Sequence, residues 1–334
     1  MSARQPPRSS PQKWTWDNDY DVRRDLLGYG PNPPNPNWPN NAKLALSFVL
    51  NYEGGGEYSV LNGDSHSESF LSESIGSPPV QQGRNLNIES MYEYGSRAGV
   101  WRVLNVFADA GVRGTVYGVG KALDDNPRVV TRCLQMGWEV AAHGDRWIDY
   151  HDMSVEKECQ DVVNCASVIR QQTGEPPKGW YIGRLSPRTH RIIYHVYKEK
   201  GWEQPWLSDS YADDLPYWKP LPNGCEGNGR EWQLVLPYSL DCNDFKYLMP
   251  NNWSSSEDFF QYLKDSFDEL YREGEKGKAK MMSVGLHARI SGKPGRIGTV
   301  SRFVEYVQSK RDVWIATRTE IAEHGRQTDP YPAE

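Results

Sequence analysis

The chain has 334 residues, 37% hydrophobic and 25% charged, a composition typical of a folded globular protein. The formal net charge is −6, and no run of Lys and Arg lies on one helical face, which argues against a nucleic-acid partner. No apolar run reaches the ~20 residues that span a bilayer, and the N-terminus has no apolar stretch of signal-peptide length. We therefore expect a cytoplasmic protein without a membrane partner. The five cysteines, an odd number without CxxC spacing, predict free thiols.

The chain is predicted to contain one catalytic domain. Residues 1–40 are rich in Pro, Asn and Arg and read as an extended N-terminal arm, because repeated X-Pro pairs exclude helix. Residues 41–325 are expected to form the domain and residues 326–334 a C-terminal tail. The apolar run 43–51 (KLALSFVLN) predicts the first buried strand.

Helix and strand signals alternate after this run. Helices are expected near 88–110, 126–136, 154–172, 187–200, 255–273 and 298–309. Strands are expected at 114–118, 138–143, 179–182, 234–238, 281–286 and 313–317. This alternation predicts an α/β fold in which helices cover a parallel sheet that closes, or nearly closes, into a (β/α) barrel. An open doubly wound sheet is the competing fold, but no GxGxxG follows the first strand.

Polar residues follow five of the predicted strands. In parallel α/β folds the loops after the strands converge on one face, so side chains at these positions meet. They are Glu53, His143, Arg184, Asp209 and His287. Each signal is weak alone, since the glycines at 54–56 can form a simple tight turn and a His at a strand end is more often structural. Together they predict a catalytic site.

Taken in order, these residues resemble the five motifs of the polysaccharide deacetylase (NodB-homology) superfamily, whose fold is a distorted (β/α) barrel. The resemblance runs from about Arg24 to Tyr306. The phrases GYGPNPPNPNWP, LNYEGGGEYSVLNGD, NIESMYEYGSRAGVWR, HGDRWIDY and MMSVGLHARISGKPGR look more narrowly like its bacterial-type allantoinase branch, which is related to cyclic imide hydrolases. The resemblance therefore implies a single-domain hydrolase of non-peptide C–N bonds.

The metal site of the superfamily is only partly matched. Glu53 stands at the position of the catalytic base, but Gly54 replaces the Asp that ligates the metal, and a glycine has no side chain to do so. His143 matches the first His ligand, whereas Trp147 replaces the second. We expect that no cofactor is required. If Zn²⁺ or another divalent metal is bound, its ligands are expected to be His143 with Glu53 or Asp145, and further substitutes would be Glu57, His66 and His151.

The resemblance also suggests a role for each catalytic residue. Glu53 would accept a proton from water, with His143 sharing it, and Arg184 would orient the Glu53 carboxylate. His287, polarised by Asp209, would protonate the leaving nitrogen or donate to the oxyanion.

A second set of residues is expected to bind the substrate. Backbone N–H groups of the 54–56 loop, with Arg146 as a further donor, would stabilise the oxyanion. Trp147 would stack on a planar substrate ring or fill the volume left by the missing metal. The predicted binding residues are Tyr52, Gly54, Gly55, Arg146 and Trp147.

Three functions remain open at this point. The first is allantoinase-like opening of allantoin or a related cyclic ureide or imide, a small-molecule substrate. The second is metal-dependent N-deacetylation of chitin oligomers or another polysaccharide. The third, more remote, is a ligand-binding module without activity. By resemblance we also expect a homo-oligomer.

Overall fold

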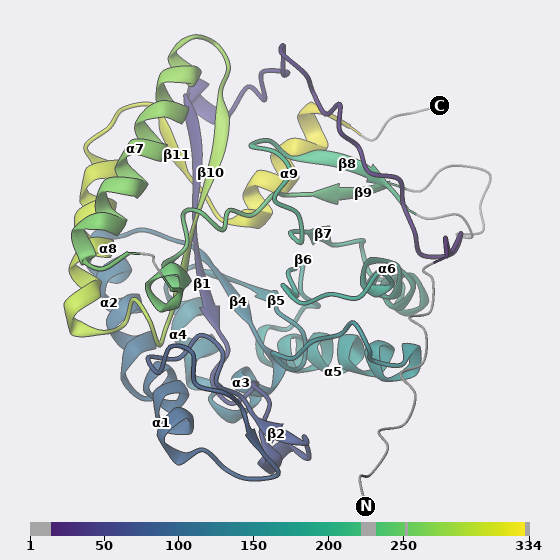
Figure 1. Cartoon of the computed structure of the whole chain (residues 1–334). Coiled ribbons are helices and arrows are strands. Elements are labelled where there is room, and N and C mark those ends of the chain that lie inside the picture. Colours follow the sequence, from purple (N-terminus) through teal and green to yellow (C-terminus); the bar gives the residue numbers. More distant parts are fainter. Residues whose placement is uncertain (1–14, 222–231, 251–252, 331–334) are drawn as a thin grey trace, which may run out of the picture.

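The computed structural model describes residues 15–221, 232–250 and 253–330 (Figure 1). Cys225 and parts of the predicted arm and tail lie outside these ranges, while the four cysteines within them are free thiols. Within the described residues nine strands form one mixed sheet of order β10-β1-β4-β5-β6-β7-β9-β8, in which β11 also pairs with β1. Its strands are β1 (Leu44–Tyr52), β4 (Thr115–Gly118), β5 (Glu139–Ala142), β6 (Gly179–Trp180), β7 (Trp206–Leu207), β8 (Tyr217–Pro220), β9 (Trp232–Val235), β10 (Lys280–His287) and β11 (Val313–Ile315).

The sheet is parallel except for the β8–β9 pair, and it curls into a distorted (β/α) half-barrel with helices outside (Figure 1). The helices are α1 (Leu86–Tyr94), α2 (Val100–Ala110), α3 (Gly120–Asp125), α4 (Arg128–Gln135), α5 (Val155–Thr173), α6 (Thr189–Lys200), α7 (Ser256–Glu275), α8 (Pro294–Gln308) and α9 (Arg318–Thr328). A small hairpin, β2 (His66–Ser67) with β3 (Val80–Gln81), follows β1. The predicted fold class is confirmed.

Strand β1 lies between β4 and β10 and is buried along its whole length. A parallel strand covered on both faces needs apolar side chains on both, which explains why 43–51 reads as a continuous apolar run. Helix α7 buries one apolar face: Phe259, Leu263 and Phe267 lie in the helix–sheet layer. A capping box at Ser255 and Asp258 begins this helix by satisfying its first free N–H groups.

Several elements differ from the sequence prediction in where they begin or end. The strand expected at 313–317 ends at Ile315, because Thr317 and Glu320 form a capping box that begins α9. Helix α9 then runs past the predicted domain boundary at 325. The strand expected at 179–182 ends at Trp180, since the N–H groups of Ile182 and Gly183 donate to the Asp209 carboxylate.

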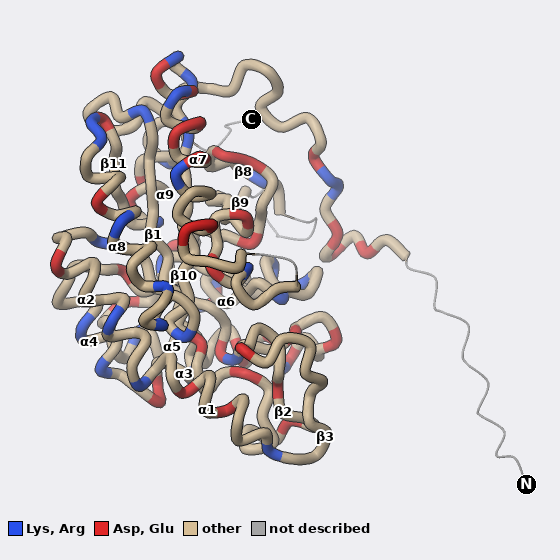
Figure 2. Tube along the Cα trace, turned by 60° about the vertical axis from the view of Figure 1, so that its left-hand side comes forward, with Lys and Arg blue, Asp and Glu red and all other residues tan. Residues whose placement is uncertain are grey.

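The described part of the arm runs along the outside of the domain (Figure 2). Its last residues belong to the core: Trp38 is buried, donates from Nε1 to the Lys280 carbonyl, and packs on Trp314 and His324. Tyr29 donates to the Pro216 carbonyl. The same view shows acidic and basic residues interspersed along the described trace. Among the described residues, no helix combines the length and the apolar character needed to cross a bilayer.

Candidate active site

The site begins where β1 ends. Glu53 is the first residue after Tyr52, and its side chain is 2% exposed. The backbone turns sharply after it, and Gly55 has a φ of +97°, a conformation that side-chain-bearing residues rarely adopt. The glycines at 54–56 are therefore needed for the turn that holds Glu53 at the strand end.

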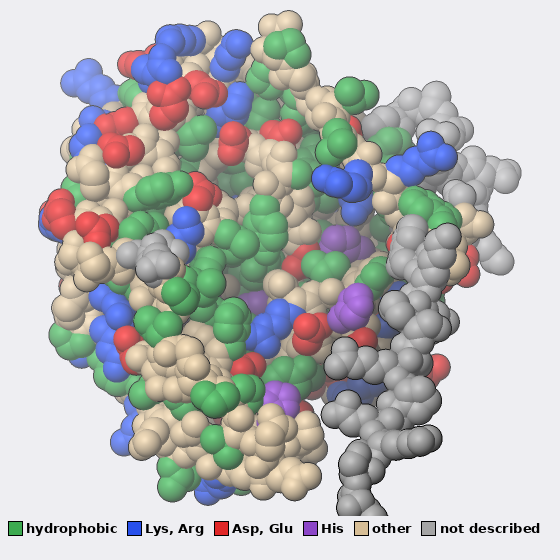
Figure 3. All heavy atoms as spheres, in the orientation of Figure 1, with side chains coloured by type: hydrophobic (Ala, Val, Ile, Leu, Met, Phe, Trp, Pro, Cys, Tyr) green, Lys and Arg blue, Asp and Glu red, His purple; other side chains and the backbone are tan. Residues whose placement is uncertain are grey.

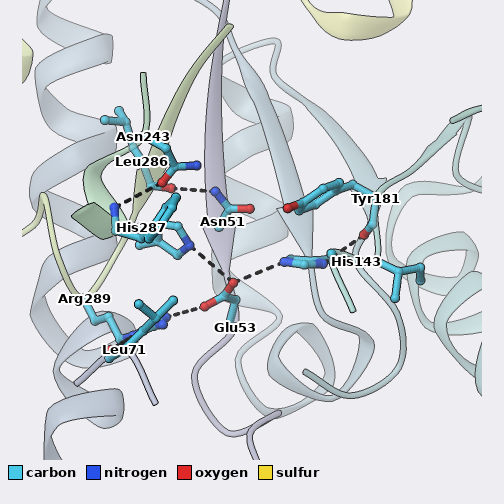
Figure 4. A network of polar contacts seen from close by, with 12 residues as sticks. Asn51, Glu53, Leu71, His143, Tyr181, Asn243, Leu286, His287 and Arg289 are labelled. Atoms are coloured by element: carbon cyan, nitrogen blue, oxygen red, sulfur yellow. Dashed lines mark hydrogen bonds and ion pairs between the residues drawn. The ribbon is translucent and has the colours of Figure 1, made fainter. Parts of the chain in front are cut away.

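Three side chains from neighbouring strand ends meet at the Glu53 carboxylate (Figure 4). His143 follows β5 and its Nε2 lies 3.1 Å from Glu53 Oε1. His287 ends β10, opposite Asn51 of β1, and its Nε2 lies 3.5 Å from the same oxygen. Arg289 bonds to Oε2. The parallel register of β1, β4, β5 and β10 thus places the carboxylate between the two histidines, and Arg289 joins them from the turn after β10.

Arg289 reaches Glu53 because the chain after β10 packs closely against η3 (Gly95–Gly99), the π-helix that joins α1 to α2. A Cβ atom on Gly99 would lie 1.9 Å from the Ala288 carbonyl oxygen, so only glycine permits this approach. Arg289 also donates from Nε to the Leu71 carbonyl. Sequence reasoning did not assign Arg289 a role, although it stands two residues after His287. Its direction depends on this turn rather than on the strand.

The charges in the site oppose the effect of burial. Burial alone would raise the pKa of Glu53, but the positive charges of Arg289 and His287 hold it well below its ordinary value. Burial would lower the pKa of His287, but the carboxylates of Glu53 and Asp244 outweigh it and raise the pKa to about 9. At neutral pH Glu53 is therefore ionised and His287 protonated.

The carboxylate that polarises His287 is Asp244, not Asp209. Asp244 Oδ1 lies 2.6 Å from His287 Nδ1, and Oδ2 accepts from the His287 N–H at 2.7 Å and from Ser291 Oγ at 2.6 Å. Asp244 starts a short 3₁₀ helix, η4 (Asp244–Leu248), capped by Asn243. The predicted strand at 234–238 ends well before Asp244, so its position at a strand end could not reveal it.

Asp209 and Arg184 have other partners. Asp209 is buried and accepts from the N–H groups of Ile182 and Gly183, and burial raises its pKa to about 6. Arg184 pairs with Glu68 at 3.2 Å rather than with Glu53. The guanidinium that contacts Glu53 directly is that of Arg289, not that of Arg184.

Two of the three predicted backbone oxyanion donors, and Arg146, are engaged within the loop region. Gly55 N–H donates to Glu57 Oε2 at 2.7 Å, and Gly56 N–H donates to the Glu53 carbonyl at 2.9 Å. Arg146 donates to the carbonyls of Gly56 and Glu57 and to Asp64.

Tyr52 does not line the cavity, whereas Trp147 takes one of its two expected positions. The Tyr52 hydroxyl bonds to Ser96 Oγ, away from the cavity. Trp147 lines the cavity wall, but its ring is covered by the guanidinium groups of Arg184 and Arg289, 4.1 and 5.0 Å from the ring centroid. This position favours the wall role over stacking on a substrate.

Glu53, His143 and His287 lie at the bottom of a cavity of about 220 Å³. Figure 3 shows histidine and basic side chains near the centre of this face, with apolar side chains around them. The remaining lining includes Asn51, Phe70, Leu71, Trp147, Tyr181, Arg184, Tyr211, Tyr238, Asn243 and Phe245. A larger cavity of about 410 Å³ shares Tyr211, Tyr238 and Leu240 with it but contains none of the three catalytic candidates.

The side chains present do not fit the metal centre of the wider superfamily. Glu53 already bonds to Arg289, and a buried guanidinium opposes a second cation at the same carboxylate. The protonated His287 has no free lone pair to offer a metal. Asp145 bonds to Asn164, and His66 stacks on Tyr58, 4.5 Å between centroids. Across residues 15–221, 232–250 and 253–330, no group of three His, Cys, Asp or Glu side chains is arranged to hold a metal ion.

Comparison with known proteins agrees with the fold. The family model "Polysaccharide deacetylase" matches residues 83–199. A candidate polysaccharide deacetylase from Schizosaccharomyces pombe is 42% identical over 316 residues, covering 93% of this chain and 99% of its own. The chain therefore belongs to the polysaccharide deacetylase family.

Two solved structures are similar over nearly the whole chain. One is a candidate polysaccharide deacetylase from Pseudomonas aeruginosa PAO1 and the other is Puue allantoinase. Each is 45% identical with a TM-score of 0.86, and each comparison covers 93% of this chain and 100% of the other.

Proposed function

We propose that this protein is a metal-independent hydrolase that opens the ring of allantoin or a related cyclic ureide or imide. The observation that carries the proposal is the Glu53 carboxylate held between His143, His287 and Arg289, where the superfamily would hold a metal ion. The similarity to Puue allantoinase supports the substrate class. A cavity of about 220 Å³ also suits one small ring.

In the proposed first step, Glu53 accepts a proton from water while the water oxygen attacks the carbonyl carbon. The low pKa of Glu53 keeps it ionised but makes it a weak base. His143 offsets this weakness. Its Nδ1 donates to the Tyr181 carbonyl, which accepts only, and its Nε2 lies 3.1 Å from Glu53 Oε1, where the two groups can share the proton taken from water.

In the second step the C–N bond breaks and the ring opens. The proton on His287 Nε2 goes to the departing nitrogen, and Asp244 holds the ring so that Nε2 points into the cavity. Before that transfer the imidazolium stabilises the negative charge on the former carbonyl oxygen. The products are a carboxylate and a free N–H on the same molecule. Arg289 keeps Glu53 oriented throughout.

Metal-dependent deacetylation of chitin oligomers is the alternative, favoured by the names of the family model and the yeast relative. It requires metal ligands that the site does not offer within the described residues. The test is to assay the purified protein, before and after exhaustive chelation, against allantoin and acetylated chitin oligomers. We expect allantoin turnover that survives chelation. Acetate release that is lost on chelation and returns with zinc or cobalt would overturn the proposal.

The rate should have a broad plateau in pH that ends on the alkaline side. Glu53 must be ionised, and its lowered pKa places the acid limb well below its ordinary value of 4.5. His287 must be protonated, and its raised pKa predicts that kcat/KM falls as the pH rises through about 9. His287→Gln should lower the rate and remove this limb. A wild-type alkaline limb near pH 6.5 would show that His287 is not held protonated by its two carboxylates.

Two sequence predictions remain predictions. A cytoplasmic location and a homo-oligomer are consistent with the proposed function but do not follow from it. A gel-filtration mass equal to that of the monomer would contradict the second.

A further inference from the structure

Arg184 lies in the catalytic cavity but takes no part in the mechanism above. Its side chain is 19% exposed, compared with 2% for Glu53 and His143 and 7% for His287. It lines the same cavity as these residues. Arg184 therefore stands nearer the mouth of the cavity, and the acid–base residues stand at its floor.

The guanidinium of Arg184 is held in a fixed position. Its NH1 donates to Glu68 Oε2, and the other oxygen of Glu68 is anchored by the N–H groups of Ser69 and Phe70, both at 2.9 Å. Its Cζ lies 4.1 Å from the ring centroid of Trp147 and 5.0 Å from that of Phe70. A cation packed on two aromatic faces loses little further freedom when it binds a ligand.

This fixed group has donors that the described protein does not use. NH2 is buried against the rings without a hydrogen-bond acceptor. Within the described chain, the Nε atom of Arg184 also makes no hydrogen bond. Unlike NH2, Nε is not fully buried. A guanidinium with unused N–H groups in a cavity is suited to a carbonyl or carboxylate oxygen.

We propose that Arg184, with Trp147 and Phe70, forms a substrate-anchoring subsite for a carbonyl oxygen on the part of the substrate farthest from the scissile bond. The inference rests on the proposed function. The scissile amide must reach Glu53 and His287 at the floor, so the opposite end of the substrate lies toward Arg184. In allantoin that end is the ureido substituent, whose carbonyl oxygen is a hydrogen-bond acceptor. Hydantoin is the same ring without this substituent.

A comparison of the two rings isolates the subsite. We would measure kcat and KM for allantoin and hydantoin with the wild type and Arg184→Met. Loss of a charged hydrogen bond to allantoin should lower kcat/KM by roughly tenfold to a hundredfold. Because the contact is made equally before and during the reaction, most of the change should be a higher KM. For hydantoin both constants should change by less than about threefold.

Arg296→Met is a matched control, because it removes another ion pair to the same segment, Arg296 with Glu73, without touching the cavity. Both substrates should react with it as with the wild type. If Arg184→Met does not fold, Arg184→Lys replaces it in the test, since lysine keeps a charge beside Glu68 but lacks the Nε donor. The ratio of kcat/KM for allantoin to that for hydantoin should again fall.

The outcomes separate the two proposals. An equal loss of kcat for both rings in the Arg184 variants would overturn the subsite and leave the proposed function standing. A wild type that opens neither ring would overturn the proposed function and the subsite together. A selective rise in the KM for allantoin supports the subsite, because a purely structural role of Arg184 would affect both rings alike.

Discussion

Glu53→Gln is expected to lower the turnover of a cyclic ureide by at least about two orders of magnitude, since removing a positioned general base typically costs 10²–10⁴ in rate. Glutamine preserves the shape of the side chain but cannot take up a proton from water. The substitution also removes the negative charge that raises the pKa of His287. As the pH rises, the residual activity should therefore begin to decline at a lower pH than wild-type activity does. A pH–rate profile measures this shift.

The fold must be checked in this variant, because Arg289 would remain buried without its carboxylate partner. Loss of one member of a buried ion pair typically costs about 3–5 kcal/mol of stability, so circular dichroism and urea unfolding should accompany the assay. Glu57→Gln is the matched control: Glu57 is a buried carboxyl group of the same loop that bonds to Gly55 and lies outside the cavity lining. Wild-type turnover by Glu53→Gln would rule out Glu53 as the base.

Asp244→Asn is expected to lower kcat by roughly two to three orders of magnitude. Asparagine retains a carbonyl oxygen for one hydrogen bond, but it has no charge to stabilise the imidazolium of His287 and can present an N–H to Nδ1 instead. The ring would then favour the wrong tautomer, as has been found when the orienting carboxylate of a catalytic His is replaced by an amide. Steady-state kinetics would measure the loss of kcat. A pH–rate profile should also show the alkaline limb at a lower pH than in the wild type.

Asp209→Asn distinguishes this assignment from the one based on the family motifs. Within the described part of the chain, Asp209 accepts hydrogen bonds only from backbone N–H groups at residues 182–183, and its Oδ2 lies 4.0 Å from His190 Nε2. An amide oxygen can still accept from these N–H groups, so we expect a much smaller loss than in Asp244→Asn. A larger loss in Asp209→Asn would show that the fourth-motif position, and not Asp244, supports the catalytic His.

Three of the five predicted strand-end residues, Glu53, His143 and His287, meet in the structure. They could be predicted because each stands at, or directly after, the C-terminal end of a strand whose apolar run is visible in the sequence. Parallel pairing then brings these ends together without any knowledge of the loops.

The partners of these residues could not be predicted in the same way. Asp244 comes from a 3₁₀ turn, and Arg289 reaches Glu53 only because the backbone after β10 packs against Gly99. Arg184 follows a predicted strand, yet its side chain turns to Glu68 and Trp147. A side chain on a loop has no periodicity that indicates its direction, so motif position alone assigned Arg184 and Asp209 to roles that Arg289 and Asp244 occupy.

The sequence by itself determined the α/β class, the alternation of strands and helices, and the family. These features depend on local residue type and spacing, which are read directly along the chain. Only the tertiary structure decided which charges surround Glu53 and which donors are already engaged in the loop. Such contacts join residues up to 236 positions apart, and their geometry is set by packing between elements rather than by any local pattern.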